Sequence, residues 1–222
     1  MTNQVFIDIG NSYTKWKYQG NFFEVATKEF NVDKLPQASK IWASNVCNQF
    51  DIEGLNFVSL KSKKLYKGLT NSYKEPALLG SDRWFAMIAS YEMSINNCFI
   101  VIDIGSAVTI DLVNYKGLHQ GGIIFPGLEK VRQIFEYFPI SINVNITGVG
   151  QSTEDAWTIG TSSLIVNNIN KKHKELKEIF PDIKVFVTGG GYFKLHKYLN
   201  FTHEYHKNLV IDGMEFYIDS MG

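Results

Sequence analysis

The sequence predicts an α/β protein made of two related halves, and three observations support this prediction. First, an apolar segment that ends in Asp-Ile-Gly at residues 5–10 recurs at residues 100–105. Second, helix signals follow each copy. Third, a short apolar run at residues 185–188 leads directly into three consecutive glycines. Strand and helix signals mix in both halves, as is typical of α/β proteins.

Each copy of the repeat predicts a strand, a tight turn, a second strand, another turn and a third strand. Residues 5–9 and 100–104 are almost continuously apolar, which indicates buried strands. Thr14 of the first copy aligns with Thr109 of the second. Turns with glycine are predicted at residues 19–21 and 115–117, and the third strands at residues 22–26 and 118–125.

Helices are predicted in the segments that follow the repeats. Ser81 is a candidate N-cap of the first helix, with Asp82 in its first turn. A second helix is predicted from Gly127 to Phe138, before Pro139. A third begins at Ser152 and Thr153 and runs towards Phe180, and a last helix covers residues 192–199.

The region with the weakest helix and strand signals lies around Asn96 and Asn97, between the two copies. We therefore predict an N-terminal domain of residues 1–97 and a C-terminal domain of residues 98–222, with the boundary uncertain by about four residues.

Composition narrows the class of protein. The 22 basic residues equal the 22 acidic ones, so no nucleic-acid partner is expected. The two cysteines, Cys47 and Cys98, lack metal-type spacing and fit a reducing compartment. No secretory leader is expected, because no charged segment precedes a long apolar stretch near residue 1, and no apolar run reaches the roughly 20 residues that a membrane span needs. A cytoplasmic protein without a membrane partner is predicted.

The two Asp-Ile-Gly loops are candidate phosphate-binding loops. A glycine leaves backbone amides uncovered, and such amides bind phosphate oxygens while the aspartate holds an accompanying cation. A plain β-turn would explain residues 8–15 alone. Their repetition at residues 103–109 favours function, because two such loops can bind one polyphosphate. The glycines at 189–191 could admit adenosine or form an ordinary turn. No Walker loop is present, so a P-loop kinase is not supported.

The order of loop, loop and glycine cluster resembles the phosphate-1, phosphate-2 and adenosine elements of the actin, hexokinase and acetate-kinase superfamily. This resemblance implies two ribonuclease H-like domains that arose by internal duplication, with a nucleotide cleft between them. Residues 73–84, with Gly-Ser-Asp-Arg at 80–83, look like the pantothenate-binding segment of type III pantothenate kinases. Further segments resemble that family in its order along the chain, at residues 43–46, 121–127, 150–153 with Gly160, and 187–190.

The resemblance implies a role for each matching residue. Asp82 would be the catalytic base, and Asp103 would contribute to a monovalent-cation site for K⁺ or NH₄⁺. Ser106 stands where the family has threonine, which puts ATP affinity in question. ATP would be bound by Asp8, Ile9, Gly10, Asn11, Ser12, Tyr13, Thr14, Lys15 and Ser106, and pantothenate by Tyr73, Gly80, Ser81, Asp82, Arg83 and Thr153.

The predicted reaction is transfer of the γ-phosphoryl group of ATP to the 4′-hydroxyl of pantothenate, which begins coenzyme A synthesis. The resemblance also implies Mg²⁺ and a homodimer. Two alternatives stay open: a kinase of another small alcohol, sugar or carboxylate, and a nucleotide-binding regulator without catalysis. Asp82 alone could simply stabilise a helix start, but Arg83 and Tyr73 favour a functional role. His203 and His206 are expected to be surface or core histidines because further ligands with zinc spacing are missing.

Overall fold

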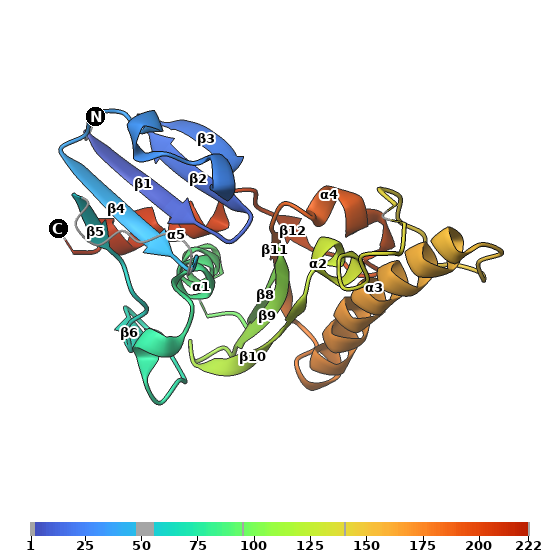
Figure 1. Ribbon diagram of the computed structural model, residues 1–222. Coiled ribbons are helices and arrows are strands. Elements are labelled where there is room, and N and C mark those ends of the chain that lie inside the picture. The colour runs from blue at the N-terminus through green and yellow to red at the C-terminus, as the bar shows by residue number, and fades with distance from the viewer. Residues whose placement is uncertain (1–2, 48–55, 95, 140, 222) are drawn as a thin grey trace. The chain divides into compact units, whose positions relative to one another are not determined.

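The computed structural model describes residues 3–47, 56–94, 96–139 and 141–221 of this α/β protein. Two five-stranded sheets form the framework, each with helices beside it (Figure 1). The chain separates into two compact units. The first contains residues 1–96, 113–121 and 208–222, and the second contains residues 97–112 and 122–207. The predicted domain boundary after residue 97 stays a prediction, because compact units and domains need not coincide.

The sheet of the first unit has the strand order β3-β2-β1-β4-β5. Its central strand β1 pairs antiparallel with β2 and parallel with β4. Gln19 and Gly20 both have positive φ, which is the geometry of a tight hairpin turn between β2 and β3. The strands are β1 Gln4–Ile9, β2 Tyr13–Tyr18, β3 Asn21–Ala26, β4 Lys40–Asn45 and β5 Phe57–Ser59.

The second sheet repeats this order as β10-β9-β8-β11-β12. Strand β11 pairs parallel with both β8 and β12. The two central strands therefore occupy the same place in their sheets, and each carries its aspartate next to its last residue. This agreement supports the internal repeat predicted from sequence. The strands are β8 Phe99–Ile104, β9 Ala107–Val113, β10 His119–Pro126, β11 Lys184–Thr188 and β12 Glu204–Tyr205.

Continuous apolar character in the central strands corresponds to burial on both faces. Val5, Ile7 and Ile9 of β1 are fully buried, as are Ile100 and Ile102 of β8. Each strand is the centre of its own core cluster, so each unit has a hydrophobic core around the strand that ends in Asp-Ile-Gly.

Two helices pack together in the first unit. Helix α1 covers Ser81–Met93 and α5 covers Leu209–Asp219. They lie beside each other next to β1 and β4 (Figure 1). Their contact is close at Gly213, where a Cβ atom would lie 1.8 Å from the carbonyl oxygen of Phe85.

Helix α1 begins where predicted, but its N-cap is Gly80 and Ser81 is its first helical residue. Ser81 is not the cap because its hydroxyl bonds to Ser44.

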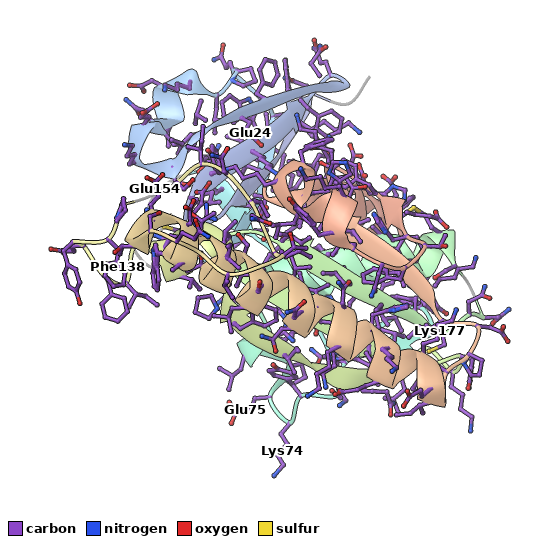
Figure 2. The ribbon with its side chains drawn as sticks, turned by 90° about the vertical axis from the view of Figure 1, so that its right-hand side faces the viewer. Glu24, Lys74, Glu75, Phe138, Glu154 and Lys177 are labelled. Atoms are coloured by element: carbon purple, nitrogen blue, oxygen red, sulfur yellow. The ribbon has the colours of Figure 1, made fainter. Side chains whose placement is uncertain are left out.

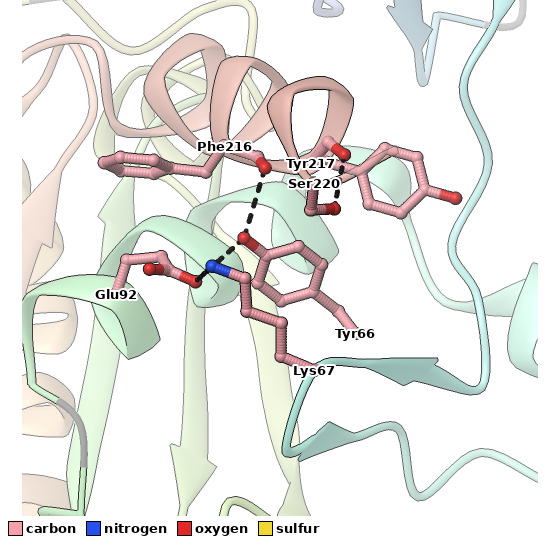
Figure 3. Close-up of polar contacts among 6 residues, drawn as sticks. All are labelled: Tyr66, Lys67, Glu92, Phe216, Tyr217 and Ser220. Atoms are coloured by element: carbon pink, nitrogen blue, oxygen red, sulfur yellow. Dashed lines mark hydrogen bonds and ion pairs between the residues drawn. The ribbon is translucent and has the colours of Figure 1, made fainter. Parts of the chain in front are cut away.

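A short hairpin fastens to both of these helices (Figure 3). It consists of β6 Leu65–Tyr66 and β7 Leu69–Thr70, with Lys67 at positive φ in the turn. The Tyr66 hydroxyl donates to a Glu92 carboxylate oxygen at 2.8 Å and lies 3.2 Å from the Phe216 carbonyl oxygen of α5. Lys67 pairs with the same Glu92 oxygen at 2.7 Å. Burial, and then the Glu92 anion, raise the pKa of Tyr66, so this hydroxyl remains a donor.

The remaining helices confirm one sequence prediction and correct two. Helix α3 spans Thr153–Ile179 with Ser152 as its N-cap, as predicted. The predicted helix from 127 to 138 is wrong in extent, because α2 covers only Leu128–Arg132. Beyond it, Phe135 and Phe138 pack on Trp157 of α3 instead of continuing the helix. The predicted helix at 192–199 divides into α4 Tyr192–Leu195 and a 3₁₀ turn, His196–Tyr198. Other 3₁₀ turns cover Thr27–Glu29, Val32–Lys34 and Pro76–Leu78.

Candidate functional site

Three sequence motifs of the first unit lie at the carboxyl end of β1. Asp8 is paired in register with Lys15 of β2 on one side and with Ser44 of β4 on the other. The Ser44 hydroxyl lies 2.9 Å from the Ser81 hydroxyl, and both side chains are buried. This contact connects the first loop to the start of α1, where Asp82 is the next residue. Residues far apart in sequence thus meet at one end of the sheet.

The loop after β1 is a tight turn held by its neighbours. The Gly10 amide donates to the Tyr13 carbonyl at 3.1 Å, and the Thr27 hydroxyl donates to the Gly10 carbonyl at 2.7 Å. Thr14 lies 3.1 Å from that hydroxyl and is fully buried. Among the residues predicted to bind ATP, Ile9 and Thr14 are therefore core residues whose side chains are covered.

The other residues of this loop present polar groups at the surface. Asn11 and Tyr13 are exposed, and Ser12 is half-buried. Lys15 is half-buried and its ammonium lies 3.4 Å from a Glu24 carboxylate oxygen. Glu24 is exposed, so solvent screens this ion pair and Glu24 restrains Lys15 only weakly. The ammonium can therefore move to neutralise a bound anion.

Asp82 is positioned by the first turn of α1. One of its carboxylate oxygens accepts the Arg83 amide at 2.7 Å. A Cβ atom at Gly80 would lie 2.5 Å from the same oxygen, so the glycine leaves room for the carboxylate. The sequence Gly80-Ser81-Asp82 therefore sets the carboxylate beside the helix N-terminus, where a negative charge is favoured. Asp82 remains partly exposed.

Arg83 joins this helix start to the segment that precedes it. Its guanidinium donates to the Tyr73 hydroxyl at 3.0 Å and lies 5.8 Å from the centre of the Tyr73 ring. Arg83 is buried, whereas Tyr73 is half-buried. The predicted substrate residues from 73 to 83 therefore form one connected group in the first unit.

The second unit surrounds the end of β8 with glycines. A Cβ atom at Gly127 would lie 2.1 Å from the Gly105 carbonyl oxygen, and the Gly127 amide donates to Ser106 at 2.9 Å. Gly191 donates to the Ile104 carbonyl at 2.8 Å. Gly189 has φ +97° and lies so close that a Cβ atom would be 2.4 Å from the Asp103 carboxylate. The loop at 103–106 is thus held between two glycine segments.

This arrangement assigns a further physical role to one sequence motif. The sequence predicts the end of a strand and the start of a helix at residues 121–127, and in the structure Gly127 also directly supports the second loop. The two consecutive glycines at 121–122 and the one at 127 were the available signal. Thr153 also belongs to the second unit, as the exposed first residue of α3, whereas the other predicted substrate residues lie in the first.

The carboxylates at the strand ends suit a cation that binds together with phosphate better than a cation that protein groups alone coordinate. Within the described residues no group of three or more His, Cys, Asp or Glu is arranged to hold a metal. His203 bonds to the Tyr192 hydroxyl at 3.0 Å, and His206 lies 3.7 Å from Glu204. Mg²⁺ commonly uses one or two carboxylates together with substrate phosphates, and Asp8 at the end of β1 is a carboxylate of this kind. In the described part of the chain, no helix is long and apolar enough to cross a membrane.

Comparisons with known proteins identify relatives of this chain. A family model described as type III pantothenate kinase matches residues 27–174. A protein named type III pantothenate kinase from Cellvibrio japonicus is 31% identical, over 96% of this chain and 96% of its own length.

Solved structures share the fold. One described as a Baf family transcriptional activator from Campylobacter jejuni has a TM-score of 0.68 and 26% identity, covering 98% of both chains. A 2-dehydro-3-deoxygalactonokinase protein from Sinorhizobium meliloti has a TM-score of 0.61 at 10% identity, covering 98% of this chain and 96% of that one. The likeness to the second shows the fold alone. The predicted actin/hexokinase-like fold class is confirmed.

Proposed function

Since this chain belongs to the type III pantothenate kinase family, we infer that the residues at the ends of β1, β4 and α1 carry out its phosphoryl transfer. Enzymes of this family use ATP to phosphorylate pantothenate, which is the first step of coenzyme A biosynthesis. The observation that carries the assignment of residues is the meeting of Asp8, Lys15, Ser44 and the Ser81–Asp82 helix start in the first unit.

Asp82 is the proposed catalytic base. Phosphoryl transfer has a loose transition state, so catalysis depends mainly on alignment and on neutralisation of charge. The Asp82 carboxylate would accept a hydrogen bond from the 4′-hydroxyl of pantothenate, align its oxygen with the γ-phosphorus and take its proton late in the transfer. Tyr73 and Arg83 would hold the rest of the substrate, and Thr153 is a further proposed substrate residue.

The loop at 10–15 is the proposed site for the ATP phosphates. Its tight turn follows Gly10, and Lys15 lies on the neighbouring strand β2, in register with Asp8. Asp8 is the proposed ligand of Mg²⁺, which when bound supplies positive charge to the phosphates. Ser106 would contact ATP from the second loop. Asp103 is the proposed ligand of a monovalent cation, K⁺ or NH₄⁺.

Release of ADP by the purified protein tests this function directly. We expect release with ATP, Mg²⁺ and pantothenate, and no comparable release with a hexose or with acetate as the acceptor. Replacing K⁺ by Na⁺ should lower the rate if Asp103 holds a monovalent cation. Pantothenate-independent ADP release, or release with another acceptor at the same rate, would contradict the assignment of substrate.

A second candidate function comes from the name of the Campylobacter jejuni structure, a transcriptional activator. A nucleotide-binding regulator would bind ATP but release no ADP in the presence of pantothenate. The relatives named as kinases favour catalysis.

We also propose that the protein is located in the cytoplasm.

The second unit offers the surface for the proposed homodimer. Residues 134–139 and 141–149 include contacts with the N-terminal half of α3, such as that of Phe138 with Trp157 and that of Ile146 with Ser163. Phe138 lies at the Glu154 end of α3, and Lys177 marks the other end (Figure 2). This region exposes large apolar side chains, namely Ile134, Tyr137, Ile142, Val149 and Leu164. We propose that these exposed apolar side chains contribute to an interaction surface.

Buried polar contacts keep this surface in shape. Arg132 is 3% exposed, and its guanidinium donates to the Asn143 carbonyl at 2.7 Å and to the Ser162 hydroxyl at 3.0 Å. It also bonds to the Ser141 carbonyl and to Thr161. Burial lowers the pKa of Arg132. Segment 141–143 is thereby fixed to α3, which gives a preformed surface for a second copy of the chain.

Leu164→Arg should convert the dimer to a monomer at micromolar concentration. Leu164 is 51% exposed on α3, one helical turn beyond Gly160, which has open space where a Cβ would be. A charge placed at both copies of a two-fold contact would weaken association by more than about tenfold. Light scattering after size-exclusion chromatography measures the mass. Ile179→Arg, at the 66% exposed last residue of the same helix, is the control. An unchanged mass for Leu164→Arg, or the same mass loss in both variants, would contradict this surface.

A further inference from the structure

His119 is a buried histidine whose ring packs against the ring of Tyr73. It is the first residue of β10 and is fully buried. Its ring is stacked on the Tyr73 ring with the centroids 6.1 Å apart and 14° between the planes. Its Nδ1 atom lies 3.2 Å from the Ser72 hydroxyl. All three residues belong to the first unit, because residues 113–121 are part of it.

Tyr73 is therefore held from several sides. Arg83 donates to its hydroxyl at 3.0 Å, and the Asn71 side chain accepts its backbone amide at 2.9 Å. Asn71 is itself fixed, since its backbone amide donates to the Lys64 carbonyl at 2.9 Å. The backbone at 71–73 and the hydroxyl of Tyr73 are thus secured, and His119 supplies the flat surface that sets the tilt of the ring.

The strand that carries His119 is itself fixed against the β6–β7 hairpin. The Thr70 amide donates to the Gly117 carbonyl at 2.8 Å, and Thr70 and Leu118 form a parallel bridge. A Cβ atom at Gly117, where φ is +71°, would lie 2.4 Å from the Gly68 carbonyl oxygen. Residues 117–119 and 68–73 therefore approach each other at backbone level, so His119 cannot move away from Tyr73 without breaking these contacts.

We propose that His119 is a positioning residue for substrate binding, which orients Tyr73 and through it Arg83. This inference rests on the proposed function, in which Tyr73 and Arg83 hold pantothenate. Histidine suits the position because its imidazole combines a flat face for the Tyr73 ring with a ring nitrogen for Ser72. Phenylalanine would keep only the face, and leucine would keep neither the face nor the nitrogen.

Two substitutions distinguish the effect of the His119–Tyr73 ring stack from that of the His119–Ser72 hydrogen bond. His119→Leu and His119→Phe both remove the ring nitrogen, but only His119→Phe keeps a flat ring against Tyr73. We expect His119→Leu to raise the KM for pantothenate about two- to tenfold, the range that an aromatic pair supports. The KM for ATP should stay within twofold of the wild type. His119→Phe should return the pantothenate KM to within about twofold of the wild type.

A matched control and a second route keep the outcome decisive. His206→Leu makes the same change in the second unit, and both KM values should remain as in the wild type. Circular dichroism and thermal melting report the folded fraction. A purely structural role for His119 predicts a smaller active fraction with both KM values unchanged, and that result would overturn the proposal. If His119→Leu does not fold, a pantothenate KM more than tenfold above the wild type in His119→Phe would overturn it instead.

The failure of this inference can be told apart from failure of the proposed function. Wild-type protein that releases no ADP with pantothenate would overturn both. Wild-type protein that is active, together with His119→Leu protein whose pantothenate KM is unchanged, would overturn the positioning role alone.

Discussion

Asp82→Asn is expected to lower the turnover number for pantothenate-dependent ADP release by about 10²–10⁴-fold, the usual contribution of a general base. Asparagine has nearly the same shape and keeps an oxygen for the Arg83 amide, which Asp82 accepts at 2.7 Å. It cannot, however, take the proton of the 4′-hydroxyl. The KM for ATP should change less than twofold, because the proposed phosphate loop at 10–15 lies on β1 and β2 and keeps its own contacts.

The helix offers a second explanation for this aspartate that must be separated from catalysis. A carboxylate in the first turn stabilises a helix by roughly 0.3–1 kcal/mol. Asp212 occupies the first turn of α5 in the same unit, so Asp212→Asn removes an equivalent charge away from the substrate segment. Both variants should lose similar small amounts of stability in urea unfolding, but only Asp82→Asn should lose turnover. Comparable turnover losses in both variants, or near-normal turnover in Asp82→Asn, would show that Asp82 is not the base.

The sequence predicted the framework well because the signals were local and repeated. Two buried strands that end in Asp-Ile-Gly, at 5–10 and 100–105, predicted the central strands of two sheets with matching strand order. Burial on both faces removes the alternation of polar and apolar residues, so such strands stand out as short apolar runs. Helix α3 was equally clear, since Ser152 caps it and Pro181 follows its end.

Contacts between distant segments could not be predicted in this way. Nothing in the sequence near Ser44 indicates that its hydroxyl meets Ser81. Nor does the sequence indicate that Gly213 of α5 packs against Phe85 in the first unit. The helix predicted from 127 to 138 is too long, because Pro139 marks only the latest point at which a helix can end and α2 stops at Arg132. Phe135 and Phe138 instead pack on Trp157 from an irregular segment. Apolar spacing alone does not separate these cases.

Part of the candidate site was also accessible from sequence, and for a chemical reason. Aspartate, glycine and hydroxyl residues after a buried strand predict phosphate chemistry wherever the backbone turns sharply. The supporting residues carry no such signature. His119 was one residue in an ordinary strand, and its stack on Tyr73 depends on the backbone contact between Gly117 and Thr70. Positioning of this kind is a property of the folded chain.

Gly189→Ala should lower the free energy of unfolding by about 2–4 kcal/mol, as substitutions that combine backbone strain with overpacking do. Gly189 has φ +97°, which side chains rarely adopt. A Cβ atom would lie 2.4 Å from the Asp103 carboxylate and 2.5 Å from the carbonyl carbon of Ile104. The second of these groups is backbone of the central strand and cannot rotate away.

The displaced atoms belong to the proposed cation and phosphate loop, so function should fall with stability. Gly190→Ala is the matched control, because a Cβ atom at this neighbouring exposed residue meets nothing within 4 Å and its φ is not in the positive range. Its free energy of unfolding should change by less than about 0.5 kcal/mol. Urea unfolding measures stability, and the KM for ATP measures the loop in the folded fraction. Equal destabilisation by the two alanines would mean that the close approach of Gly189 to β8 does not constrain the second unit. A raised ATP KM in Gly189→Ala at wild-type stability would place the nucleotide itself against this glycine, since strain in the loop cannot then be the cause.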